Sequence, residues 1–306
     1  MGSSDFMRRS KKRKKGYLLG YSDFAEYSKE SNVEVSLDLD IYIKGIGLKS
    51  LHQGFWQKGQ PVNLDELPKA QRSYTVKLID MFPKEVENVL DVGAGVGDNA
   101  IHMVEKGMKV TCISPAPSQE QYFIENILPE YENISFIRSR FEDLKIDEEF
   151  DVVLMSESNN YFPIENGLDQ AIRYLKKDGY LVIGSHFRKD NREDFKEMHM
   201  YESYLEKAKE RGLVLIEDID VTNQVVQTME LYHGIYKYIP PITKVLIDFY
   251  KTSFAKKYRF ISKIVSAFFN KELDMAKEML FEVGPRRTDP ELFIEYLSYR
   301  FISFKK

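Results

Sequence analysis

Cysteine and long apolar runs are both scarce in this chain of 306 residues. Cys112 is the single cysteine, so the sequence excludes a disulfide framework and a cluster of thiolate metal ligands. No stretch approaches 18 consecutive apolar residues, and no apolar segment follows the basic N-terminus. The sequence therefore predicts neither a membrane span nor a secretory signal. From these absences we expect a cytoplasmic protein with no metal site.

Positive charge is scarce outside the first 15 residues. Those residues hold seven of the 44 Lys and Arg side chains and one of the 48 Asp and Glu side chains, which leaves 37 basic against 47 acidic residues. Because an acidic body repels polyphosphate, the composition argues against a nucleic-acid partner. The basic arm is interpreted as a solvated segment, as a peripheral contact with anionic lipid or RNA, or as a segment that closes over a bound ligand.

Glycine is concentrated in one short stretch, "LDVGAGVGDNA" at 90–100. It lies between a buried-strand pattern and an amphipathic helical pattern, and such a turn lets a ligand approach the backbone at a helix N-terminus. The spacing G-x-G-x-G departs from the dinucleotide fingerprint, and no acid follows the next strand. Asp91 and Asp98 instead suit a cationic ligand rich in donors, such as S-adenosylmethionine. An NAD-dependent oxidoreductase remains the alternative.

Strand and helix patterns alternate through the middle of the chain. The strands are predicted at 88–92, 109–113, 134–138, 151–155 and 180–185, and the helices at 97–106, 118–127 and 165–177, the last ended by Gly179. This alternation predicts an α/β, Rossmann-like, doubly wound parallel sheet. Ligands of such sheets bind at the carboxyl ends of the strands, which is where the polar segments of this sequence lie.

Four segments, in this order, resemble the class I S-adenosylmethionine-dependent methyltransferases of small molecules: "VLDVGAGVGDNA", "FEDL", "FDVVLMSESNNYF" and "YLKKDGYLVIGSHF". The resemblance covers roughly residues 45–220. It implies S-adenosylmethionine as the cofactor and a seven-stranded sheet. The residues that it implies at the cofactor are Asp91, Gly93, Ala94, Gly95 and Asp98 at the methionine moiety, Phe141 and Glu142 at the adenine, and Ser156 after the fourth strand.

The segment after the second strand departs from that family, most of whose members place a ribose-binding acid there. Here the chain reads "SPAPSQ" at 114–119, which is similar to a stretch in the cyclopropane fatty acid synthases and their methyltransferase relatives. This likeness implies that Gln119 supports the nucleoside with Ser114 beside it. An amide can pair with a diol as donor or acceptor.

Ahead of the core, "LHQGFWQKGQ" at 51–60 resembles the H-x-G-x-W segment of methyltransferases that act on tocopherols and sterols. In that family the segment helps to close the cofactor pocket, which implies that His52, Phe55 and Trp56 lie over the ligand. Taken by itself, a lone tryptophan beside aromatic residues is more often part of a core.

The C-terminal third adds the segments expected to complete the sheet. We predict a sixth strand at 213–216 and a seventh within 291–304, separated by a mostly helical insertion rich in aromatic residues. The predicted parts are an N-terminal arm and lead-in (1–45), a methyltransferase core (46–220), a helical substrate cap (221–290) and the final strand (291–306). Aromatic residues either pack such an insertion or line a pocket for a hydrophobic acceptor, such as a lipid or isoprenoid.

Methyl transfer needs a base only when the acceptor arrives protonated. The candidates near the strand ends are Glu157, His186, Tyr161, His52 and His233, with Glu157 first because related lipid-modifying enzymes keep a carboxylate there and His186 second. The sequence thus predicts an enzyme that methylates carbon, oxygen or nitrogen of a small, hydrophobic acceptor. A cofactor-binding protein without catalysis is the alternative outside the enzymes.

Overall fold

The computed structural model describes residues 43, 45, 47–191, 195–249, 252, 286 and 288–306. The basic arm lies outside these residues, and so do seven of the aromatic residues of the predicted insertion, namely Tyr250, Phe254, Tyr258, Phe260, Phe268, Phe269 and Phe281. The chain divides into two compact units, Met1–Val225 with Tyr296–Lys306, and Val226–Glu295.

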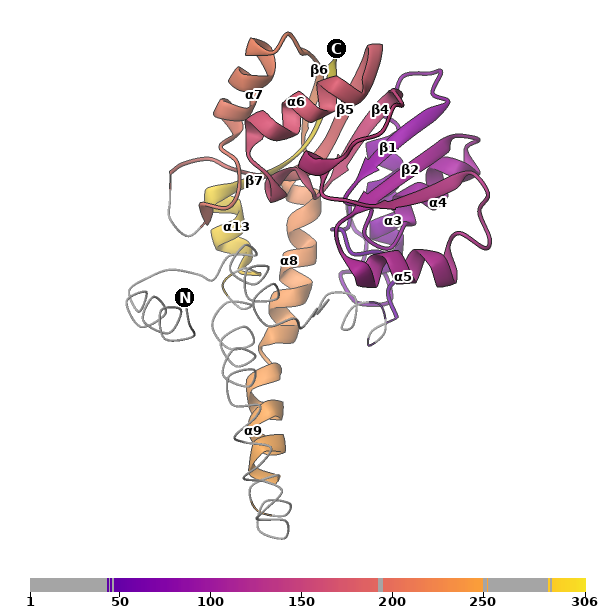
Figure 1. Cartoon of the computed structure of the whole chain (residues 1–306). Coiled ribbons are helices and arrows are strands. Elements are labelled where there is room, and N and C mark those ends of the chain that lie inside the picture. The colour runs from indigo at the N-terminus through magenta and orange to yellow at the C-terminus, as the bar shows by residue number, and fades with distance from the viewer. Residues whose placement is uncertain are drawn as a thin grey trace, which may run out of the picture. The chain divides into compact units, whose positions relative to one another are not determined.

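The first unit contains a seven-stranded sheet with the order β3-β2-β1-β4-β5-β7-β6, which Figure 1 shows with its helices. The strands are β1 (Asn88–Val92), β2 (Lys109–Ser114), β3 (Ile134–Arg138), β4 (Phe150–Ser156), β5 (Leu175–Arg188), β6 (Val214–Asp220) and β7 (Leu297–Lys305). The pairs among β1 to β5 are parallel, whereas β7 runs antiparallel to both β5 and β6. The prediction of a seven-stranded, doubly wound α/β fold is confirmed.

Helices connect the strands of the first unit and pack against its sheet. They are α3 (Leu67–Ile79), α4 (Asp98–Glu105), α5 (Pro117–Asn126), α6 (Ile164–Tyr174) and α7 (Tyr201–Glu210), with the short 3₁₀ turns η2 (Phe141–Asp143) and η3 (Asn159–Tyr161). Pro117 opens α5, where its fixed φ suits the first helical turn and its missing N–H costs nothing. The described helices of the remainder are α8 (Thr222–Tyr236), α9 (Ile239–Phe249) and α13 (Pro290–Tyr296).

The core lies on both faces of the central strands. Val89, Leu90, Val153 and Leu154 are fully buried, because strands covered by helices on both faces present apolar residues at every position. Cys112 on β2 is also buried and acts as a small core side chain. None of the helices among the described residues is long and apolar enough to cross a membrane.

The prediction for helix 165–177 was wrong at its end. The helix stops at Tyr174, and Leu175 already pairs with Phe150 as the first residue of β5. Leu175 is fully buried, and a buried leucine fits the apolar spacing of a helix as well as the start of a covered strand. Gly179 therefore lies within β5 rather than at a helix end.

The prediction for the last segment was correct only in its second half. Residues 290–296 form α13, and the seventh strand begins at Leu297. The Asp289 carboxylate accepts the backbone N–H groups of Glu291 and Leu292, at 2.9 and 3.2 Å, and so caps the helix. Asp-Pro at 289–290 is a sequence signal for the start of a helix. The alternating residues that follow it instead favoured a strand for the whole segment.

Candidate functional site

The glycine turn joins β1 to α4 at the carboxyl edge of the sheet. Gly93, Gly95 and Gly97 have φ values of +75°, +58° and +84°, a region that favours glycine. A Cβ on Gly93 would lie 2.6 Å from the Cβ of Ser158, so the loop after β4 also requires a bare backbone here. The turn therefore needs glycine for its backbone conformation and for its packing against Ser158, and its contact with a ligand stays a prediction.

Asp91 is the most unusual polar residue at this edge. Its side chain is 1% exposed, and neither carboxylate oxygen has a hydrogen-bond partner among the described residues. Burial raises the pKa of Asp91 to about 7, against a smaller lowering by His52. Buried polar groups without partners are rare in proteins, and they point to a ligand that supplies the missing donors.

Glu157 follows β4 and has a φ of +60°, which is uncommon for a residue with a side chain. Its N–H donates to Gly184 O at 2.7 Å, and this contact with β5 holds the backbone in place. Such a conformation persists only where the surroundings enforce it, and it often marks a functional position.

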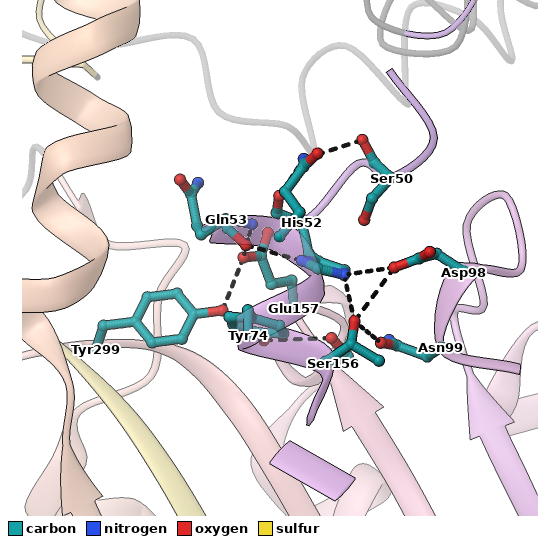
Figure 2. A network of polar contacts seen from close by, with 11 residues as sticks. Ser50, His52, Gln53, Tyr74, Asp98, Asn99, Ser156, Glu157 and Tyr299 are labelled. Carbon is teal, nitrogen blue, oxygen red and sulfur yellow. Dashed lines mark hydrogen bonds and ion pairs between the residues drawn. The ribbon is translucent and has the colours of Figure 1, made fainter. Parts of the chain in front are cut away.

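One oxygen of the Glu157 carboxylate is saturated by hydrogen bonds. Oε1 accepts the Gln53 N–H at 2.8 Å and the Tyr299 hydroxyl at 2.7 Å, as Figure 2 shows. Oε2 has no hydrogen-bond partner among the described residues. Burial raises the pKa of Glu157, although His52, the Gln53 amide and the Tyr299 hydroxyl oppose that effect.

A second tyrosine extends the network behind Glu157. The Tyr74 hydroxyl on α3 lies 2.8 Å from the Tyr299 hydroxyl and 3.2 Å from Ser156 Oγ. Both tyrosines are fully buried, and burial raises the pKa of each further above its usual value. They remain neutral hydroxyl groups over the physiological pH range.

His52 connects this network to the glycine turn. Its Nε2 lies 3.2 Å from Asp98 Oδ2 and 3.0 Å from Thr75 Oγ1, and its Nδ1 lies 2.8 Å from Gln53 O. Thr75 also donates to Asn99 Oδ1 at 2.9 Å. The segment before α3 is thus tied to the start of α4 through side chains (Figure 2).

The remaining residues predicted as catalytic differ in their surroundings. His186 on β5 pairs with Tyr299 on β7, and the ring centroids lie 4.6 Å apart, so His186 borders the network. Tyr161 in η3 is 54% exposed and is not among the residues that contact Glu157. The base role of each stays a prediction.

Trp56 and Phe141, both predicted at the cofactor, are core side chains in this structure. Trp56 is 1% exposed, and its N–H on the backbone donates to Gln224 O at 3.2 Å. Phe141 is 3% exposed, and its ring packs against Phe162 and Tyr174 at centroid distances of 5.5 and 6.4 Å. Their contact with a ligand remains untested.

Glu142 lies in η2, which follows β3, and Ser114 is the last residue of β2. Glu142 forms an ion pair with Arg140 at 3.1 Å and borders an open hollow beside α6. Ser114 is 4% exposed, and its Oγ accepts the Ala116 N–H at 3.2 Å. Ser114 therefore shapes the turn toward Gln119, which is half-buried in the first turn of α5.

Replacement of Gln119 by alanine tests the ribose prediction. We expect the dissociation constant of S-adenosylmethionine to rise by roughly 2- to 10-fold, the usual effect of one lost hydrogen bond. The thermal midpoint should stay within about 1 °C, because the side chain belongs to no hydrogen bond within the described fold. Calorimetric titration and thermal melts measure both quantities, and equal cofactor affinity in the variant would remove Gln119 from the site.

Three residues of the site were not singled out from the sequence: Tyr74, Thr75 and Tyr299. Tyr74 and Thr75 lie on α3, a helix for which the sequence analysis made no prediction. Tyr299 was recognised only as part of an alternating strand, since 142 residues separate it from Glu157 along the chain. Only the sheet order, with β7 inserted between β5 and β6, brings its hydroxyl to the carboxyl end of β4.

Comparison with known families decides what kind of domain carries this site. Residues 89–179 match a family described as a methyltransferase domain. The chain contains a methyltransferase domain. The matched residues run from β1 into β5 and include the glycine turn, Asp91 and Glu157.

Solved structures of the same fold extend the likeness to most of the chain. A geranyl diphosphate C-methyltransferase from Streptomyces coelicolor, in complex with Mg²⁺, geranyl diphosphate and S-adenosyl-L-homocysteine, is 15% identical, with 92% of this chain and 96% of that chain covered at a TM-score of 0.62. The [4+2]-cyclase SpnF is 15% identical, with 88% and 93% covered and a TM-score of 0.62. The StiE O-MT is 16% identical, with 83% and 85% covered and a TM-score of 0.57. No curated protein matches the sequence.

The methyltransferase domain resembles the class I, S-adenosylmethionine-dependent methyltransferases, as the sequence analysis predicted. These comparisons do not favour an NAD-dependent oxidoreductase. The roles of individual residues, the acceptor and the cellular compartment stay predictions.

Proposed function

We propose that this chain transfers the methyl group of S-adenosylmethionine to carbon, oxygen or nitrogen of a small, hydrophobic acceptor. The observation that carries the proposal is the Asp91 carboxylate, which is buried beside the glycine turn of a methyltransferase domain and has no hydrogen-bond partner in the part of the chain that the structure describes. A ligand with an ammonium group and hydroxyl donors would satisfy both of its oxygens.

The charges at the carboxyl edge fit such a cofactor. Asp91, Asp98 and Glu157 all interact with the imidazole of His52, and Asp98 also interacts with His102, whose pKa burial lowers. Acidic side chains therefore outnumber the positively charged one, and this excess favours a ligand with a net positive charge. S-Adenosylmethionine supplies an electrophilic methyl group on a sulfonium.

The chain's own residues divide the remaining tasks. The bare backbone of Gly93 to Gly95 and the Asp91 carboxylate would hold the methionine moiety. Ser114 and Gln119 would hold the ribose, and Glu142 would hold the adenine. Glu157 would act on the acceptor, because its Oε2 is free while Oε1 is fixed by Gln53 and Tyr299. This carboxylate takes the proton that the acceptor gives up.

A hydrophobic acceptor is supported by the aromatic side chains of the sequence and by the relatives. One solved relative has geranyl diphosphate, an isoprenoid, in its complex. Contact of the basic arm with an anionic membrane would bring the chain to a lipid-borne acceptor. The arm lies outside the described residues, so this contact rests on the sequence alone.

The experiment is a transfer assay with methyl-labelled S-adenosylmethionine and a panel of isoprenoid, phenolic and amine acceptors. We expect mass spectrometry to find a product heavier by one labelled methyl group, formed in step with S-adenosylhomocysteine. Enzyme with Asp91→Asn is the matched control and should give much less product at the same cofactor concentration. Because one relative of this fold is a cyclase, an acceptor that changes without gaining the label would contradict methyl transfer.

A further inference from the structure

His52 precedes the part of the chain that matches the methyltransferase domain, yet its ring is buried within the site. The side chain is 7% exposed. Its ring stacks on that of Tyr74, with centroids 4.3 Å apart and an interplanar angle of 22°. Packing of this kind fixes the direction of both ring nitrogens, so their hydrogen bonds report where the protons lie.

Both ring nitrogens of His52 face atoms that accept hydrogen bonds. Nδ1 lies 2.8 Å from Gln53 O, a carbonyl oxygen that can only accept. Nε2 lies 3.2 Å from Asp98 Oδ2, and an ionised carboxylate also can only accept. A neutral imidazole has one N–H and leaves one of these contacts between two lone pairs. An imidazolium satisfies both contacts.

Thr75 supports the same assignment of protons. Its hydroxyl lies 2.9 Å from Asn99 Oδ1 and 3.2 Å from Asp98 Oδ2, and donation of its proton to either oxygen leaves the hydroxyl oxygen to accept from His52 Nε2 at 3.0 Å. The Nε2 proton is then shared between Asp98 and Thr75. When His52 carries both protons, each of these contacts joins one hydrogen-bond donor to one acceptor.

The pKa shifts of both His52 and Asp98 agree with this geometry. Burial alone would lower the pKa of His52, but the hydrogen bond and charge of Asp98 outweigh it, and Gln53 and Glu157 add to the rise. For Asp98, burial opposes ionisation, yet His52 and Thr75 bring its pKa below the usual value. Two other histidines show the opposite behaviour, since burial lowers the pKa of His102 and His199.

We propose that His52 is a fixed imidazolium and the positioning residue of this site, because it binds Asp98 and its charge favours the ionised form of the adjacent Glu157. Other titratable groups around Glu157 are the neutral hydroxyls of Tyr74 and Tyr299, and His186 lies beyond Tyr299. None of these hydroxyls supplies a positive charge. The proposed charge of His52 does not depend on the function of the chain, whereas the effect of His52 on turnover rests on the proposed function.

The charge state is measured by nitrogen NMR of the whole chain in which histidine is labelled with ¹⁵N. At pH 7.5 we expect both ring nitrogens of His52 to give the shifts of an imidazolium, while His102 and His199 give those of a neutral ring. The signal is assigned by its loss in His52→Gln. A neutral His52 at pH 7.5 would overturn the proposal, and this result does not depend on any activity.

The effect on Glu157 is measured from the pH profile of turnover in His52→Gln. Removal of the positive charge should move the acidic limb of kcat upward by about 1 pH unit, the lower end of the effect of a neighbouring opposite charge. His199→Gln is the matched control, because His199 is a buried histidine bonded to Asn159 O at 2.8 Å, and its profile should not move. A uniform loss of kcat in His52→Gln with an unmoved limb would show a structural role only. If wild type transfers no methyl group, the proposed function fails while the NMR result still decides the charge.

Discussion

Glu157→Gln lowers turnover by about 10²- to 10⁴-fold, the range expected when a general base is removed. The amide has the size of the carboxylate, and its oxygen can still accept the Gln53 N–H and the Tyr299 hydroxyl. The backbone at φ +60° is therefore held as before. What the variant loses is the ability of the second oxygen to take a proton. Turnover is measured under cofactor saturation with any acceptor that the assay above identifies.

Cofactor affinity separates this effect from a general loss of structure. We expect Glu157→Gln to bind S-adenosylmethionine within about threefold of wild type, because the proposed cofactor contacts lie on the glycine turn and after β2 and β3. The wild-type rate should rise with pH through the pKa of Glu157, which burial raises, since the ionised form is the base. Retention of more than half of the wild-type turnover would instead assign the base role elsewhere, with His186 as the next candidate.

Asp91→Asn weakens S-adenosylmethionine binding by about 1–3 kcal/mol, which is roughly 5- to 150-fold in the dissociation constant, while stability without cofactor does not fall. We do not expect the loss of stability that usually follows removal of a buried hydrogen bond, because neither carboxylate oxygen has a partner in the described fold. A buried carboxylate without partners lowers the stability of the folded chain, and only a ligand would use it. An amide of the same shape removes the charge and leaves the packing intact.

The pH dependence of stability gives a second measure of Asp91. Its pKa is about 7 in the folded chain, above the usual value of 3.8 that applies to the unfolded chain. The folded state thus binds more protons between these values, and the stability of the wild type falls as pH rises from about 4 to 7. Asp91→Asn should lose this slope. Urea unfolding at pH 5 and pH 8 measures it.

Asp151→Asn is the matched control for Asp91→Asn. Asp151 is also a carboxylate at a strand end, but it accepts two backbone N–H groups and pairs with Lys176 at 2.7 Å. Its replacement should lower stability and leave cofactor affinity unchanged. The opposite pattern in the two variants, with Asp91→Asn destabilised and still binding, would contradict the assignment of Asp91 to a ligand.

Much of the fold could be predicted because local patterns and sheet topology agree. The apolar residues of β1 and β3 are bounded by clear turns, and those predictions coincide with the observed strands. Leu175 shows where this reasoning stops, since a buried leucine satisfies a helix and a covered strand equally. Its true position was decided by pairing with Phe150, a contact that no local pattern reveals.

Residues of the site could be singled out where a polar side chain follows a strand directly, or where a segment resembles a known family, as for His52. Asp91 and Glu157 were found in the first way, since polar residues at strand ends of such sheets gather at one edge. Tyr74 and Tyr299 could not be found, because the hydroxyl contact between them joins residues 225 positions apart. Their tyrosine rings satisfy the apolar pattern of a helix and a strand, and that pattern hides the hydroxyl groups.

The central claim is that the carboxyl edge of this sheet binds S-adenosylmethionine, and isothermal titration of the full chain tests it most directly. The account predicts saturable binding of S-adenosylmethionine at one site per chain, no measurable binding of NADH, and a clear loss of affinity in Asp91→Asn but not in Asp151→Asn. Saturable binding of NADH with none of S-adenosylmethionine, or equal S-adenosylmethionine affinity in wild type and Asp91→Asn, would contradict it.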